Sequence, residues 1–334
     1  MNPKPAPERG ARSARRELAV RLEADLAHRE SLFAAAAVRV RERDDPEALH
    51  DLRVTSRRLS EAFRLWGALL DARYAKRVRR RLRRLRREAG PIREKEATLE
   101  LLRSYEKSQP AETREAVQPY VRVLRREIKR GRRRMADLVS SKRVGFILEA
   151  SARTRLPVRS RADKLPDPLA LARRHLASAR RTSERLMIAL GPSGTEEAFH
   201  DARIAIKKDR YAEECWIEAE PSRDRARVMR LQALQRGLGA LRDHAVLETA
   251  LEMQALELAG RGHLSQAQAL RPLLEAVRRG HAEVRAAFRR LAASGQRSKA
   301  RPGHETPEAA TKAASAGGPP KLRAVHPHAR TPGS

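Results

Sequence analysis

The sequence predicts an all-helical protein, and three observations lead to this fold class. Hydrophobic residues recur at helical spacing through most of the chain. Alternating runs of Val, Ile, Thr and Tyr, which are typical of strands, are missing. Pro and Gly residues divide the chain into segments that are long enough for helices. Hydrophobic residues make up 40% of the chain, which is sufficient for a buried core.

The expected helices lie between two terminal segments that have no helical pattern of their own. Residues 1–14 are rich in Pro and Arg and are expected to be disordered, and residues 293–334 are expected to form a disordered basic tail. Helix breaks are predicted at 44–46, Gly90-Pro91, Gln109-Pro110, 156–168, 191–194, 221–222 and 260–262. Residues from about 150 to 167 are interpreted as a linker, and Asp167-Pro168 as an N-cap followed by the first helical residue.

An internal repeat organises the helical region, which is expected to span residues 15–292. Residues 48–58 read ALHDLRVTSRR and residues 198–208 read AFHDARIAIKK, at an offset of 150 residues. A second matched pair follows in each copy, with AGPIREKEATLELL at 89–102 and LGALRDHAVLETAL at 238–251. Two ordered motifs that repeat in step indicate duplication of one helical unit. The halves are predicted at about 15–149 and 168–292.

Each copy of the first motif lies on an amphipathic helix, at about 100° of rotation per residue. In the first copy, His50, Arg53 and Arg57 share one face, and Leu52, Leu59, Phe63 and Trp66 share the opposite face. In the second copy, His200, Arg203, Lys207 and Tyr211 share the polar face. Asp209 falls on the apolar side, and the sequence offers no physical reason for it.

The charge of the chain indicates an anionic partner. Its 73 Lys and Arg residues against 42 Asp and Glu residues give a formal net charge of +31. Candidate partners are therefore nucleic acid, polyphosphate and an anionic membrane surface. Cations stacked at helical spacing repel each other, so they favour a compensating anion, and the Arg guanidinium binds phosphate oxygens in pairs. A merely solvated charged face is the alternative interpretation.

The candidate anion ligands come from the repeated motifs and from two Arg-rich runs at 76–87 and 122–134. They are His50, Arg53, Arg57, Arg58, Arg80, Arg84, Arg87, Arg93, Arg126, Arg130, His200, Arg203, Lys207, Lys208, Arg210, Tyr211 and Arg242. Glu94 and Asp243 follow Arg93 and Arg242 directly, and we expect these acids to cap a helix or to orient an arginine.

No catalytic constellation is recognisable in the sequence. It holds no Gly-rich phosphate loop, no His-Glu-x-x-His and no Cys-x-x-Cys, so we expect no enzyme activity, no metal and no cofactor. Aromatic residues are only 3% of the chain, which disfavours base stacking with single-stranded nucleic acid. One cysteine, no secretory signal and no long apolar stretch predict a cytoplasmic protein without a membrane span.

At these motifs the sequence resembles the CHAD family, the conserved histidine α-helical domain. His50 to Leu59 is similar to the family pattern His-x-x-Arg-Val-x-x-x-Arg-Arg-Leu. The second copy matches His-x-x-Arg-Ile-x-x-Lys-x-x-Arg-Tyr-x-x-Glu at His200, Arg203, Ile204, Lys207, Arg210, Tyr211 and Glu214. Residues 239–243 are similar to its Gly-x-x-Arg-Asp element, whereas the first copy has Glu94 in place of Asp. The resemblance covers about residues 15–292.

The resemblance implies two pseudo-symmetric four-helix bundles, a basic central cavity and binding of inorganic polyphosphate. A location on polyphosphate granules is expected as part of the leading functional hypothesis. The expected function is therefore non-enzymatic polyphosphate binding. Two other functions stay open, namely nucleic-acid or nucleoid binding through general basic charge, and an enzyme that acts on phosphoanhydrides. The oligomeric state does not follow from the sequence.

Overall fold

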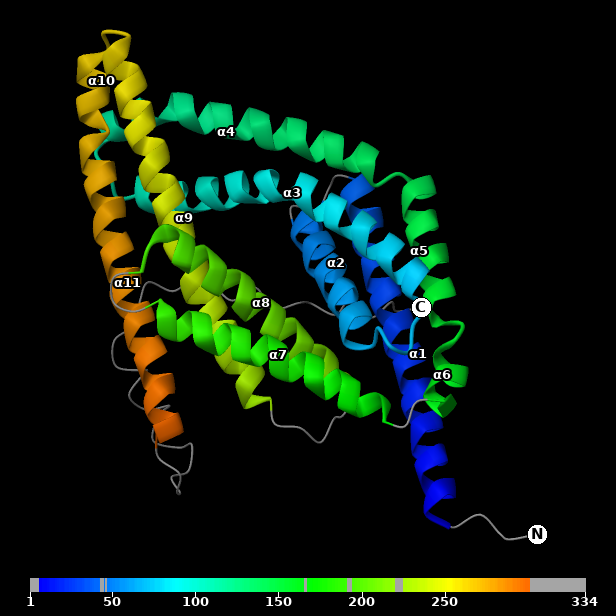
Figure 1. The fold of residues 1–334 in the computed structure, drawn as a ribbon. Coiled ribbons are helices and arrows are strands. Elements are labelled where there is room, and N and C mark those ends of the chain that lie inside the picture. Colours follow the sequence, from blue (N-terminus) through cyan, green and yellow to red (C-terminus); the bar gives the residue numbers. More distant parts are fainter. Residues whose placement is uncertain are drawn as a thin grey trace, which may run out of the picture. The chain divides into compact units, whose positions relative to one another are not determined.

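The computed structural model describes residues 6–42, 45, 47–164, 167–190, 194–219 and 225–300. The structure is 90% helical, and the described ranges contain no strand, which confirms the predicted fold class. The helices are α1 (Ala6–Glu42), α2 (Ala48–Leu65), α3 (Ala72–Glu106), α4 (Ala111–Leu138), α5 (Ser141–Arg155), α6 (Val158–Lys164), α7 (Pro168–Ala189), α8 (Glu196–Ala219), α9 (Ala226–Gly260), α10 (Leu264–Ala269) and α11 (Arg271–Ala300) (Figure 1).

Several predicted helix boundaries are confirmed by local structure. The Asp167 side chain accepts a hydrogen bond from the Ala170 backbone N–H, and Pro168 is the first residue of α7, as predicted. Gly262, which follows α9, has a φ of 82°, a left-handed conformation that glycine adopts at little cost. Gln109-Pro110 separates α3 from α4. The predicted breaks at 191–194 and 221–222 fall mainly on residues outside the described part of the chain.

The predicted break at Gly90-Pro91 is wrong, because α3 continues through both residues. Pro91 cannot donate a hydrogen bond to the carbonyl one turn earlier. Pro91 is exposed, so water is available to that carbonyl, and the packing of α3 on both sides maintains the helix. The hydrophobic pattern of the segment was therefore a better guide to its structure than the proline.

The segment interpreted as a linker is instead largely helical. After the interruption at Leu156-Pro157, residues 158–164 form α6, which packs against α1. Val158 and Ala162 are completely buried, so hydrophobic burial stabilises this short helix. The structure also places residues 6–14 within α1 and residues 293–300 within α11, whereas residues 1–5 and 301–334 lie outside the described ranges.

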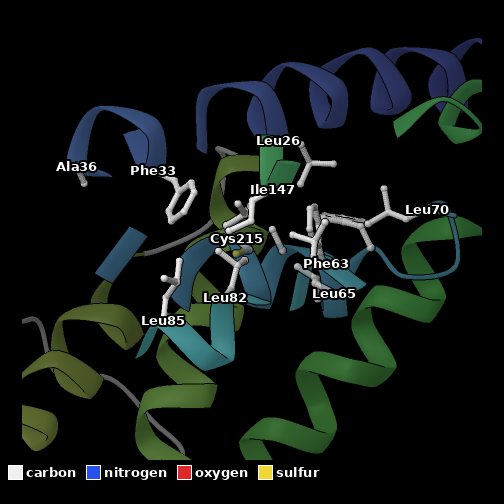
Figure 2. Packing of buried hydrophobic residues seen from close by; sticks show 14 of the residues in the cluster. Leu26, Phe33, Ala36, Phe63, Leu65, Leu70, Leu82, Leu85, Ile147 and Cys215 are labelled. Atoms are coloured by element: carbon white, nitrogen blue, oxygen red, sulfur yellow. The ribbon is translucent and has the colours of Figure 1, made fainter. Parts of the chain in front are cut away.

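The largest core cluster joins helices from both sequence repeats (Figure 2). It contains Leu26 and Phe33 of α1, Phe63 of α2, Leu82 of α3 and Cys215 of α8. The ring of Trp66, just after α2, stacks on Trp216 of α8, with centroids 5.9 Å apart and planes at 15°. These two tryptophans are separated by the repeat offset of 150 residues. Equivalent positions of the two motifs therefore lie next to each other.

Two further clusters complete the core. One joins the ends of α3 and α4 to α9, α10 and α11, and the other joins α7, α8, α9 and α11. In Figure 1, α3 runs beside α4 and α7 runs beside α8, and both pairs are in contact. The described residues up to 292 group as one compact unit. The finer division into two halves stays a prediction. Among the described helices, none has an apolar stretch of the length that a membrane crossing requires.

Candidate anion-binding site

Contact between α2 and α8 brings the polar faces of the two repeated motifs together. Positive side chains of these two helices lie close enough to positive side chains of α3 and α9 for their charges to lower the pKa of several of them. We call this group the cationic cluster. Its members are Arg53 and Arg57 of α2, Arg86 and Arg93 of α3, Arg203 and Lys207 of α8, and Arg242 of α9.

Arg53 lies at the centre of the cationic cluster and lacks full compensation. It is partly buried, and its Nη1 atom is buried without a hydrogen-bond partner. Burial, followed by the charges of Arg57, Arg203 and Arg93, lowers the pKa of Arg53 to about 10. A Cβ atom on Gly90 would lie 3.4 Å from this same Nη1. The guanidinium of Arg53 therefore lies next to the α3 backbone at Gly90.

Lys207 shows the strongest effect of the crowded charges. Burial, then the positive charges of Arg203, Arg57 and Arg53, lowers its pKa to about 6 from the usual 10.5. The neighbouring Arg203 also has a lowered pKa because of burial, which the charge of Asp243 opposes, and its Nε atom is buried without a partner. For Lys207, burial is the main cause of the lowered pKa, and the charges that act on its amine besides burial are all positive.

Arg86 belongs to the cationic cluster although the sequence did not single it out. Its Nη1 donates to the Ser56 carbonyl and to the Ser60 Oγ, each at 2.8 Å. Burial, then Arg57 and other nearby arginines, lowers its pKa to about 10. A signal was present in the sequence, because Arg79, Arg83, Arg86, Gly90 and Arg93 follow helical spacing along one flank of α3. Arg86 thus shares a flank with the repeated Gly-x-x-Arg motif.

The acids of the second motif pair face arginines of the opposite copy. Glu94 on α3 accepts hydrogen bonds from Arg242 on α9, at 3.1 Å to Oε2. Burial raises the pKa of Asp243, and the charges of Arg203 and Arg93 oppose this effect. Each acid therefore orients or balances arginines at the border of the cluster.

The two predicted histidines lie at the periphery of the cationic cluster, and both are exposed. Loss of hydration, then the charge of Arg93, lowers the pKa of His50. His200 borders a small cavity of about 20 Å³ that Arg203, Arg242 and Arg285 also line. The space is about that of one water molecule.

Other side chains that were predicted to bind the anion already interact with side chains of the protein itself. Arg58 and Arg210 both pair with Glu214, at 3.1 and 3.4 Å. Tyr211 is buried, and the guanidinium carbons of Arg57 and Arg210 lie 5.9 and 4.4 Å from its ring centroid. The remaining predicted ligands are exposed and lie outside the cluster. They are Arg80, Arg84, Arg87, Arg126, Arg130 and Lys208.

Asp209, which the sequence left unexplained, has a structural role. Its side chain is completely buried and accepts hydrogen bonds from Ser183 of α7 and Arg227 of α9. Arg227 also donates to Glu213 at 2.8 Å. This network connects three helices behind the polar face of α8, and it positions Lys207 and Arg203 indirectly. Among the described residues, no group of three or more His, Cys, Asp or Glu side chains is arranged to hold a metal ion.

Comparison with known proteins identifies the family. The chain is similar to the crystal structure of the CHAD domain from the plant Ricinus communis, at a TM-score of 0.56 and 23% identity over 79% of this chain and 91% of that one. It is also similar to PptA from Streptomyces chartreusis, at a TM-score of 0.52 and 22% identity over 82% of this chain and 98% of that one. None of the curated proteins matches. The CHAD family model matches residues 24–252, and the chain belongs to the CHAD domain family.

Proposed function

We propose that this protein binds inorganic polyphosphate in the cationic cluster and does not alter it chemically. One observation carries the proposal, namely the set of converging, partly buried cations in which burial, then the charges of Arg203, Arg57 and Arg53, lowers the pKa of Lys207 to about 6. A bound polyanion would supply the negative charge that these side chains lack in the free protein. The association of CHAD domains with polyphosphate supports the choice of anion.

We further propose that the site is a basic cavity between two pseudo-symmetric four-helix bundles. The stacked pair Trp66 and Trp216, at equivalent positions of the repeat, supports a two-fold relation between α2 and α8. The order of contacts supports it as well, because α1 packs on α2 as α7 packs on α8. In this arrangement Arg53 corresponds to Arg203 and Arg57 to Lys207, so a linear polyanion would meet similar ligands in both directions.

The chemistry of the cationic cluster suits a bare phosphate chain. Guanidinium groups bind pairs of phosphate oxygens, and Lys207 adds a single positive charge when it is protonated. The buried aromatic rings near the site, Tyr211 and the stacked tryptophans, are covered by protein and offer no surface for nucleobases. Glu94 and Asp243 face arginines, so these carboxylates are engaged in pairing instead of being grouped for Mg²⁺. A cytoplasmic location on polyphosphate granules is part of the proposal.

Nucleic-acid binding is the alternative, because exposed arginines of α3 and α4 lie outside the cluster. Direct competition between polyphosphate and duplex DNA of equal phosphate content distinguishes the two functions. We expect polyphosphate to displace the duplex from the full chain, and a chain without residues 301–334, which keeps α11 whole, to retain polyphosphate binding. Equal or tighter duplex binding, or loss of all anion binding with the tail, would contradict the proposal. Release of phosphate from polyphosphate with Mg²⁺ or Mn²⁺ would contradict its non-enzymatic part.

A further inference from the structure

A second hollow lies between α3 and α4, beside the cationic cluster and different from it in chemistry. Its volume is about 870 Å³, which is within the range of pockets that hold small organic ligands. Arg93 borders both this α3–α4 cleft and the cluster. The cleft is lined by Glu47, Arg93, Glu96, Leu99, Glu100, Arg103, Ser104, Lys107, Arg125, Ile128, Lys129, Arg132 and Arg133.

Cations surround the rim of the α3–α4 cleft. The rim cations are all exposed, and they are Arg103 of α3, Lys107 directly after α3, and Arg125, Lys129 and Arg133 of α4. Within the described part of the chain, none of these five has an acid at ion-pairing distance. Their charges are therefore available to phosphate groups of a ligand.

The inner part of the α3–α4 cleft is not suited to a bare polyanion. Leu99 and Ile128 contribute apolar surface, which the aliphatic stems of the surrounding Arg and Lys side chains extend. Glu96 is only 8% exposed and is held by Arg132 at 2.7 Å and by Arg93 at 3.5 Å. Its Oε2 lies 3.5 Å from Arg93 but is buried and accepts no hydrogen bond. The two arginines balance this carboxylate, so the inner cleft combines apolar surface with an acceptor atom that lacks a donor, which suits an N–H group on an apolar body better than a bare phosphate chain.

We propose that the α3–α4 cleft binds an organic phosphate, namely a nucleoside triphosphate, as a site separate from the polyphosphate cluster. The phosphates contact the rim cations Lys129 and Arg133. The base lies on Leu99 and Ile128, where guanidinium planes can stack on it, and its amino group is directed to Glu96. The cleft has apolar, acidic and basic lining residues, and this mixture favours a nucleoside triphosphate over inorganic polyphosphate.

Calorimetric titration of the full chain with ATP, in parallel with inorganic tripolyphosphate, tests the inference. Lys129→Ala/Arg133→Ala should weaken ATP binding roughly tenfold, since it removes charged contacts to phosphate. The neutral variant Leu99→Ser should weaken ATP binding by roughly threefold or more and leave tripolyphosphate binding unchanged. The matched control is Arg181→Ala/Arg185→Ala, which removes two exposed cations of α7 and should change neither affinity.

Three results would overturn the inference. The first is unchanged ATP affinity in Lys129→Ala/Arg133→Ala, whose exposed side chains are not needed for folding. The second is an equal loss in the α7 control, which would mean that ATP responds only to total charge. The third is loss of ATP binding in Arg53→Ala/Arg203→Ala, because ATP would then occupy the cluster. Normal ATP binding in that variant supports the inference even if polyphosphate does not bind the protein.

Discussion

Polyphosphate binding should take up a proton at Lys207. In the free protein the pKa of Lys207 is about 6, so this amine is mostly neutral above pH 7. Burial lowers it most, and positive charges from Arg203 of its own helix and from Arg57 and Arg53 of α2 lower it further. The acids that oppose this charge at Arg203 are Asp243 of α9 and Glu94 of α3. A bound phosphate chain would reverse the effect and raise the pKa of Lys207 toward its usual range.

The size of the effect follows from linkage. Between the free and the bound pKa, uptake of one proton makes the affinity fall by about tenfold for each unit of pH increase. From pH 7 to pH 9 we therefore expect a loss of roughly a hundredfold. His50 contributes little in this window, because its pKa is lowered from the ordinary value of 6.5.

The lowered pKa of Lys207 also affects folding, since the unfolded chain binds this proton more tightly than the folded chain does. Stability of the free protein should rise from pH 6 to pH 10, by at most about 1.4 kcal/mol per pH unit.

Titration calorimetry in buffers of different ionisation enthalpy measures this proton directly. At pH 8 the wild-type protein should take up close to one proton for each bound chain. Lys207→Arg keeps a charged side chain at the position but has no titration in this range, so it should bind polyphosphate with little pH dependence. Binding without proton uptake, or an unchanged pH dependence in Lys207→Arg, would refute the reasoning.

Three further predictions concern stability, and urea unfolding checks each of them. Arg53→Met should raise the free energy of unfolding by about 1 kcal/mol, because it removes an uncompensated partly buried charge and keeps an aliphatic side chain; a clear loss of stability would show that Arg53 is already balanced. Asp209→Ala should lower it by about 3 kcal/mol or more, since Arg227 loses a buried partner, whereas the exposed Asp201→Ala should change it by less than about 0.5 kcal/mol. Gly280→Ala should cost about 1–3 kcal/mol because its Cβ would overlap the Tyr105 hydroxyl, and the cost should shrink in a Tyr105→Phe background, where that oxygen is missing; an equal cost in both backgrounds would locate the clash elsewhere.

The sequence was most informative where the same pattern occurred twice. The repeat identified Arg53, Arg203 and Lys207, and the structure brings these side chains together through the contact of α2 with α8. Helical periodicity predicted the fold class, and Pro and Gly residues predicted several helix ends, but the interruptions between α2 and α3 and between α4 and α5 were not predicted. The sequence spacing also places Arg86 on the same flank of α3 as Gly90 and Arg93. Because Arg86 stands in a run of arginines, the sequence did not distinguish it from its neighbours.

The remaining features depend on contacts between distant segments, which no local pattern contains. Asp209 is a charged residue on the apolar face of its helix, and its position is explained only by the hydrogen bonds from Ser183 and Arg227, which lie on other helices. The continuity of α3 through Pro91 depends on packing along its whole length, and local propensity alone favoured a break. Total charge was equally uninformative about position, because Arg80 and Arg126 are the same residue type as Arg53 but lie exposed outside the cluster.

The central claim is that the cationic cluster, and not the total charge of +31, binds the anion. The most direct test is a polyphosphate titration at moderate salt of two double variants that remove the same charge. Arg53→Ala/Arg203→Ala should weaken binding by roughly a hundredfold, from about 1.5 kcal/mol for each lost charged contact. Arg181→Ala/Arg185→Ala, on the exposed surface of α7, should bind as the wild type does. Equal affinities in the two variants would contradict the account.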